Sequence, residues 1–133
     1  SSDRGILDKM MSKALNGENI KIYGDGSYIR DYVHLDDCIN AINSAVKYRE
    51  RLNGQKFVIG SGEGLSIKNA FQTVINVAEE ITKKRVEIEY EEPPKNLSKI
   101  EFRSFVGDIE PFKSATHWFP KWDLIDGLRY SYK

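Results

Sequence analysis

The stretch that decides the fold is GDGSYIRDYVHLDD, residues 24–37. Its two glycines predict a tight turn, and the IRDYVH that follows alternates enough between apolar and polar residues to predict a strand. Asp36 or Asp37 can then cap a helix over DDCINAINSAVKYRER, residues 36–51. A turn, a strand and a helix therefore follow one another, and a lone cation, Arg30, heads the strand.

The segments on both sides of this stretch predict a mixed α/β chain. Apolar residues at helical spacing cover residues 1–15, and Asn16 and Gly17 end that helix. IKIY at 20–23 predicts a short strand. Further strands are expected at 55–62, 85–92 and near 102–106, and further helices at 65–84 (capped by Ser66), within 108–120 and at 123–133 (capped by Asp123). We expect four or five helices and four or five short strands.

The composition restricts the class of protein. The 133 residues fit one small domain or a part of a larger one, and 40% hydrophobic residues favour a packed core over disorder. Lys plus Arg and Asp plus Glu each number 20, so there is no basic excess of the kind that nucleic-acid-binding and membrane-binding proteins show. The single cysteine, Cys38, excludes an internal disulfide and favours a reducing compartment, so we expect a soluble, cytoplasmic protein.

The start of the chain is abrupt. The first helix begins almost at residue 1, and no initiator methionine precedes it. We therefore expect a fragment of a longer chain.

The spacing of glycine, histidine and cysteine residues suggests several possible sites. Gly60, Gly62 and Gly64 follow a predicted strand, but as G-x-G-x-G rather than the dinucleotide fingerprint, so a tight turn and a ligand-facing turn both stay open. His34 and Cys38 lack further convincing ligands, and we expect no metal site. Nothing in the sequence predicts a self-sufficient nucleophilic centre.

Two arginines have a position that suits an anion. Arg30 and Arg103 each lie near the start of a predicted strand, where a rigid element would hold the guanidinium. A guanidinium binds phosphate oxygens in pairs and stays protonated. The alternative is a structural ion pair, for Arg30 with Asp31 or Asp36, and spacing alone leaves both interpretations open.

Three blocks of the sequence carry a resemblance to a known family. They are IKIYGDGSYIRDYVHLDDCINAI (20–42), FVIGSGEGLSIKNAF (57–71) and FVGDIEPFKSATHWFPKWDLIDGL (105–128). In this order they resemble the C-terminal half of the extended short-chain dehydrogenase/reductases, the NAD-dependent nucleotide-sugar epimerases and dehydratases, of which UDP-glucose 4-epimerase is the familiar member. The resemblance implies that residues 1–133 form the substrate-binding lobe, a mixed α+β part of a Rossmann-type enzyme that lacks the N-terminal NAD-binding core.

The resemblance also implies roles for individual residues. Arg30 would clamp the diphosphate of a nucleotide-sugar, and Arg103 would add a second phosphate contact. Lys21 and Tyr23 would border the base, and Glu63 would lie near the ribose and phosphate. By the same resemblance Asp36 and Asp37 are structural residues rather than catalytic acids.

The chemistry of the family would lie outside this chain. Family members bind NAD(P) on an N-terminal domain and use a Tyr-x-x-x-Lys pair, whereas no tyrosine here has a lysine four residues later. We therefore expect no catalytic or cofactor-binding residue here and no activity from the chain alone. The intact enzyme would be a homodimer that acts through a 4-keto-sugar as a 4-epimerase. A 4,6-dehydratase, a reductase and a non-catalytic nucleotide-sugar-binding module are the alternatives.

Overall fold

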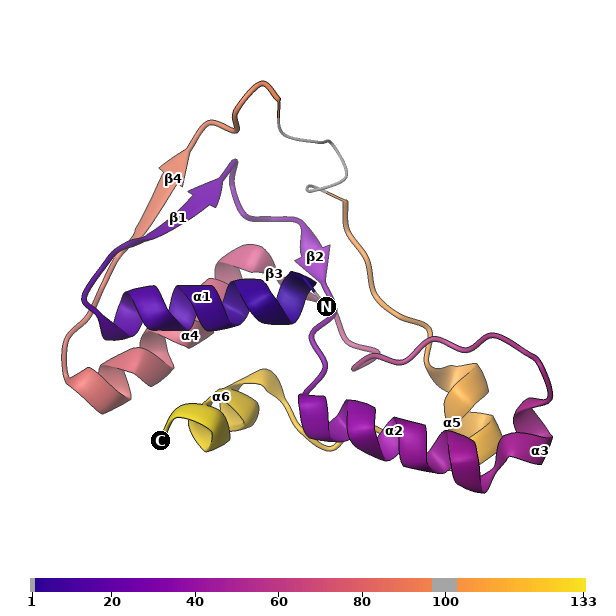
Figure 1. Ribbon diagram of the computed structural model, residues 1–133. Coiled ribbons are helices and arrows are strands. Elements are labelled where there is room, and N and C mark those ends of the chain that lie inside the picture. Colours follow the sequence, from indigo (N-terminus) through magenta and orange to yellow (C-terminus); the bar gives the residue numbers. More distant parts are fainter. Residues whose placement is uncertain (1, 97–102) are drawn as a thin grey trace.

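The larger part of the core is built by two long helices and one face of a small sheet. The computed structural model describes residues 2–96 and 103–133. Helix α1 (Ser2–Leu15) packs along α4 (Ile67–Thr82), and α6 (Leu124–Tyr132) packs on α4 as well (Figure 1). The apolar stripes of α1 and α4 meet between the helices, as their helical spacing predicts. The residues buried there include Met11, Ala14, Ala70, Phe71, Val74, Val77 and Ala78.

The sheet beside these helices is parallel. Strand β1 (Ile20–Tyr23) pairs with β4 (Ile88–Glu91), with Ile20 opposite Ile88. Ile20 and Ile22 point into the core, while the alternate residues of β1 are exposed, because successive side chains of a strand point to opposite faces. One face of this sheet is therefore covered by α1 and α4, and the other carries Lys21 and Tyr23.

A second, smaller sheet follows directly in the sequence. Strand β2 (Ile29–Arg30) pairs antiparallel with β3 (Leu65–Ser66), so that Arg30 lies opposite Leu65. Ser66 also caps α4, because its hydroxyl accepts a hydrogen bond from the Asn69 N–H at 3.1 Å. The N-terminus of α4 is thus tied to the strand that carries Arg30.

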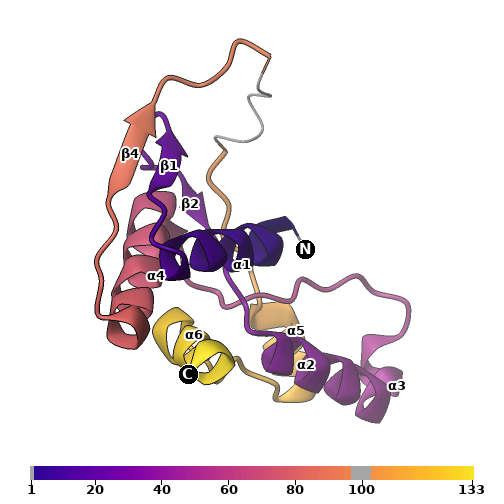
Figure 2. The same ribbon diagram turned by 60° about the vertical axis from the view of Figure 1, so that its left-hand side comes forward.

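The remaining helices form a separate group. Figure 2 shows α2 (Leu35–Lys47), α3 (Arg49–Leu52) and α5 (Glu110–Thr116) gathered to one side of α1 and α4. A second apolar cluster holds them together, formed by Ala41, Ile109, Phe112 and Trp118. Other apolar side chains of α2 are exposed, Ile42 and Val46 by 64% and 59%, so that the outer side of this helix is uncovered within the described part of the chain.

Most predicted elements are confirmed, and four differ from expectation. Six helices and four strands occur in the described residues, because the segment over 36–51 divides at Tyr48 into α2 and α3. The strand at 29–34 shortens to two residues. No strand forms at 55–62. Within the described chain no neighbouring strand is hydrogen-bonded to this segment, and a strand needs such a neighbour. The strand expected near 102–106 begins outside the described residues, and residues 103–106 form neither helix nor strand.

The start of α2 also differs from expectation. The cap is His34 rather than an aspartate: its Nδ1 accepts a hydrogen bond from the Asp36 N–H at 3.0 Å. Its buried ring stacks on Trp122 with 4.6 Å between centroids. Asp123 does cap α6, as predicted. Within the described residues no helix has the length and apolar character needed to span a bilayer.

An ion-pair cluster joins the last helix to α4. Glu80 accepts hydrogen bonds from Arg129 at 2.7 and 3.1 Å, and Lys133 lies 2.7 Å from the same carboxylate. The bonds from Arg129, and then those from Lys133, lower the pKa of Glu80 from 4.5 to about 2. The same pair raises the pKa of Arg129. The cluster therefore stabilises the docking of α6 while Glu80 is ionised.

A change of Glu80→Gln is expected to lower the urea midpoint at pH 7. Because the folded pKa lies below the unfolded one, the contribution of Glu80 is complete above about pH 4.5 and disappears as the pH falls towards 2. The difference between the wild type and the variant should therefore shrink over that range in unfolding curves recorded from pH 7 down to pH 2. Glu92→Gln, at an exposed glutamate after β4, is the matched control. A constant difference at all pH values would contradict the assignment.

Candidate functional site

The candidate site surrounds β2, which is held on both sides. On one side lies β3, and on the other the chain segment 103–107. The Ile29 carbonyl accepts a hydrogen bond from the Phe105 N–H at 2.9 Å, and the Ile29 N–H donates to the Ser104 hydroxyl at 3.0 Å. Residues far apart in sequence thus meet beside Arg30, which a sequence pattern cannot reveal.

Arg30 is a half-buried side chain on this strand. Its guanidinium donates a hydrogen bond to the Ile29 carbonyl at 3.1 Å and lies over the Tyr28 ring, 5.2 Å from the centroid. The ring face attracts the cation and limits its rotation. Arg30 is therefore a cation with a defined direction on a short strand, although it is the last residue of β2, whereas the sequence predicts that it heads the strand.

Arg103 lies on the segment that pairs with β2. It is exposed and directly precedes Ser104, whose hydroxyl is bonded to Ile29. The structure therefore brings the backbone segments of both arginines together at Ile29. Residues 97–102, which lead into Arg103, are outside the described residues.

Asp31 organises the loops around this strand. Its carboxylate accepts hydrogen bonds from the Ser61 N–H at 2.7 Å, the Ser61 hydroxyl at 2.6 Å, the Gly62 N–H at 3.2 Å and the Gly107 N–H at 2.9 Å. These four donors match the four lone-pair positions of an ionised carboxylate. Within the described residues, the hydrogen-bond donors to Asp31 thus come from two loops. Arg30 is not one of these donors, so the Arg30–Asp31 ion pair considered as an alternative is not found in the described part of the chain. Asp36 was the other acid expected as a possible partner of Arg30. Its Oδ2 atom lies 3.9 Å from His34 Nδ1.

The glycine turn is shaped by this carboxylate. The amides of Ser61 and Gly62 point at Asp31, so the donors that a dinucleotide phosphate would need are already bonded within the protein. This geometry favours the tight-turn interpretation. The residues of this turn do not fit an NAD site.

Glu63 follows in the same turn. Its N–H donates to the Ser61 hydroxyl oxygen at 3.1 Å, and its carbonyl oxygen lies 3.0 Å from the same hydroxyl, whose single proton is donated to Asp31. A side chain at Gly64 would lie 2.5 Å from Ile29 Cγ2, so only glycine lets the chain cross β2 so closely. The exposed Glu63 is thus held within one residue of that crossing.

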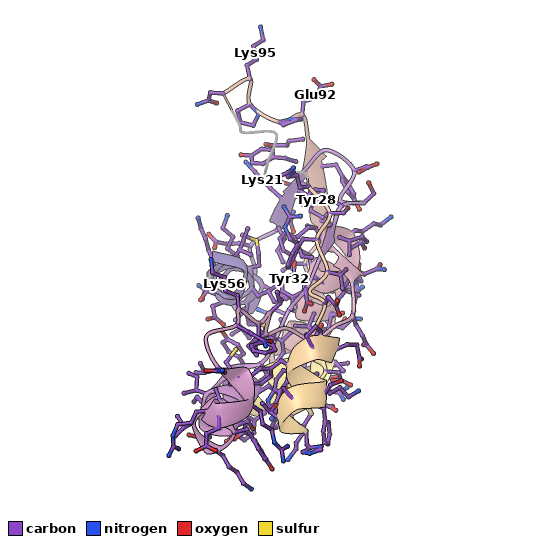
Figure 3. All side chains as sticks on the ribbon, turned by 90° about the vertical axis from the view of Figure 1, so that its right-hand side faces the viewer. Lys21, Tyr28, Tyr32, Lys56, Glu92 and Lys95 are labelled. Carbon is purple, nitrogen blue, oxygen red and sulfur yellow. The ribbon has the colours of Figure 1, made fainter. Side chains whose placement is uncertain are left out.

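Lys21 and Tyr23 lie on the exposed face of β1. Lys21 Nζ is 3.3 Å from a Glu91 oxygen on β4, and Tyr23 is 37% exposed. Figure 3 shows Lys21 at the level of Tyr28, above Tyr32. The structure therefore places these two residues on the neighbouring sheet and pairs Lys21 with Glu91.

The turn between β1 and β2 is stabilised by its own side chains. The Ser27 hydroxyl and the Ser27 N–H both donate to Asp25 Oδ1, at 2.7 and 3.0 Å. These bonds, the hydroxyl first, lower the pKa of Asp25. Gly24 and Gly26 both have positive φ, which glycine adopts without strain. The turn therefore fixes the approach of β1 to β2 and remains anionic at neutral pH.

Sequence reasoning missed Asp31 and underrated Asp37. Asp37 is 1% exposed, and its carboxylate accepts the N–H groups of Lys121 and Trp122, each at 3.0 Å. Its carbonyl accepts from the Trp118 indole N–H at 3.0 Å. The expectation that Asp37 is structural fits these bonds. For Asp31, the signal in the sequence was an acid next to the arginine together with glycines that permit close backbone approach.

Known proteins match this chain in sequence. Residues 1–60 match the model of the NAD dependent epimerase/dehydratase family. The chain is 30% identical, over 92% of its length, to the low-salt glycan biosynthesis protein Agl12 of Haloferax volcanii, and covers 36% of that protein. It is 28% identical to a dTDP-glucose 4,6-dehydratase of Streptomyces griseus, with 92% of this chain and 35% of the relative covered.

A solved structure shares the fold. The UDP-glucose 4-epimerase of Thermotoga maritima with UDP-glucose is 30% identical, with a TM-score of 0.71 over 93% of this chain and 37% of that one. The chain thus spans about a third of the length of these relatives.

Proposed function

We propose that residues 1–133 bind the nucleotide diphosphate of a nucleotide-sugar, because this chain belongs to the NAD-dependent epimerase/dehydratase family. One observation carries the proposal: the segments of Arg30 and Arg103 meet at Ile29. Two guanidinium groups on adjacent segments suit a diphosphate, which carries two charged groups a short distance apart.

The other candidate residues have supporting parts in this proposal. Glu63 lies at the turn that crosses β2 and is suited to the hydroxyl groups of a ribose. Lys21 and Tyr23 lie on the sheet that the Gly24–Ser27 turn connects to β2, and an exposed aromatic ring there suits the face of a base. Together these residues bind the nucleotide end, and binding energy from that end holds the sugar in place for reaction.

The intact enzyme would act through a 4-keto-sugar, as a 4-epimerase in the first instance. The similarity to a UDP-glucose 4-epimerase structure supports this choice, and the dTDP-glucose 4,6-dehydratase relative supports the alternative. NAD would supply hydride transfer. Since the glycine turn is occupied by Asp31 and no Tyr-x-x-x-Lys pair is present, we assign no catalytic step to these residues and propose that the chain alone binds without turnover.

Replacing Arg30 with alanine is expected to weaken nucleotide binding by about 1.5–3 kcal/mol, the usual contribution of a hydrogen bond to a charged group. Calorimetric titration of the wild type and the variant with UDP, dTDP, CDP and GDP measures this loss and identifies the base. Arg49→Ala is the matched control, because Arg49 is an exposed arginine at the start of α3 that donates a hydrogen bond to the Val46 carbonyl in the last turn of α2. Equal affinity of the wild type and Arg30→Ala would contradict the proposal.

A further inference from the structure

We infer that Asp31 is the positioning residue of this site, a role that rests on the proposed function. It touches none of the expected ligand groups; it acts by holding the segments that carry them. The hydrogen bonds to its carboxylate come from positions 30, 31 and 76 residues away in the sequence. These bonds converge on one side chain next to Arg30.

Each segment that Asp31 holds carries a candidate ligand for the nucleotide-sugar. Arg30 precedes Asp31 in the chain. The Ser61–Gly62 turn continues into Glu63, and Gly107 ends the segment that begins with Arg103. When the carboxylate binds the turn and Gly107 together, it fixes the position of both loops relative to the strand of Arg30. A site for a diphosphate needs this fixed spacing, because a guanidinium displaced by an ångström no longer meets its phosphate oxygen.

Two glycines are shaped for this contact. A Cβ at Gly60 would lie 2.7 Å from Asp31 Oδ2, and a Cβ at Gly107 would lie 3.3 Å from the same oxygen and 3.0 Å from Val58 Cγ1. Neither glycine has a positive φ, so turn conformation does not explain them. Close approach to the carboxylate explains Gly60, and at Gly107 both Val58 and the carboxylate leave little room for a side chain. The sequence therefore makes room for the Asp31 bonds at both loops.

The charge of Asp31 is also compatible with a neighbouring anion. A bare carboxylate beside Arg30 would repel a diphosphate and compete for the guanidinium. Here three backbone N–H groups and one hydroxyl surround the carboxylate, and these donors stabilise its charge within the protein. Asp31 therefore holds the loops in place, while the Arg30 guanidinium is oriented by its contacts with the Tyr28 ring and the Ile29 carbonyl.

The test is Asp31→Asn, alone and combined with Arg30→Ala. An amide has the same shape but replaces one acceptor oxygen with a donor, so it cannot accept all four bonds. We expect UDP affinity, measured by calorimetry, to fall about tenfold or more in the single variant. In the Arg30→Ala background, Asp31→Asn should lower UDP affinity by a clearly smaller factor, because a positioning residue acts through the group that it positions. Asp36→Asn, which removes the same charge five residues away, should bind as the wild type does.

Amide hydrogen exchange provides a reading that needs no ligand. In Asp31→Asn, exchange at Phe105, which is bonded to Ile29, should become faster, while exchange in α4 stays as in the wild type. Faster exchange throughout the chain would show a general loss of structure and overturn the positioning role. So would wild-type affinity in Asp31→Asn, or unchanged exchange at Phe105. If the wild type itself binds none of the nucleotides, the proposed function fails, and the exchange at Phe105 alone decides whether Asp31 fixes these loops.

Discussion

Replacing Phe71 with alanine is expected to lower the free energy of unfolding by roughly 3–5 kcal/mol, the range for deleting a buried aromatic ring. Phe71 is 3% exposed and belongs to the core where α1, α4 and the β1 face meet. The loss combines transfer of the ring to water with the cavity that remains. Urea unfolding followed by circular dichroism measures it.

Phe119→Ala is the matched control for this change. Phe119 carries the same ring but is 51% exposed, so its removal leaves no buried cavity. Its unfolding midpoint should stay close to that of the wild type. Similar losses in the two variants would mean that Phe71 is not buried in the core as described.

Replacing Asp37 with alanine is expected to lower the free energy of unfolding by roughly 3 kcal/mol, because hydrogen bonds to a charged group contribute about 1.5–3 kcal/mol each and are partly replaced by water. The change leaves the N–H groups of Lys121 and Trp122 without their acceptor and releases the segment before α6. The same urea unfolding measurement, with tryptophan fluorescence for the environment of Trp122, reports both effects.

The neighbouring aspartate provides the comparison. Asp36 is half-buried in the first turn of α2, where its charge interacts favourably with the helix N-terminus. Asp36→Ala should therefore cost about 0.3–1 kcal/mol. If the two alanine variants were equally stable, the assignment of Asp37 as the buried connection between α2 and the α6 segment would be wrong.

The helices were the most predictable elements of this chain. Helix α4 combines a capping serine, Ser66, with a regular apolar stripe, and the cap directly precedes the sixteen residues that carry the stripe. The same is true of α6 and its cap, Asp123. Such signals act between neighbours in the sequence, so reading the sequence locates them correctly.

The strand expected at 55–62 shows where that reasoning ends. FVIG has the apolar, β-branched character of a buried strand, yet no ladder forms there in the described chain, and Val58 is 45% exposed. Apolar character indicates that a segment tends to be buried, but a strand also requires a partner at hydrogen-bonding distance. The His34 cap was missed for a related reason, since its ring is held by Trp122, which lies far along the chain.

The candidate site divides in the same way. The sequence alone predicts a glycine turn followed by a short strand that contains Arg30, because these features are consecutive in the chain. Only the tertiary structure decided that the Arg103 segment lies beside that strand and that one carboxylate, Asp31, binds both adjoining loops. The physical reason is that a local pattern specifies the conformation of neighbouring residues, whereas hydrogen bonds between residues 30 to 76 positions apart form only after the chain has folded.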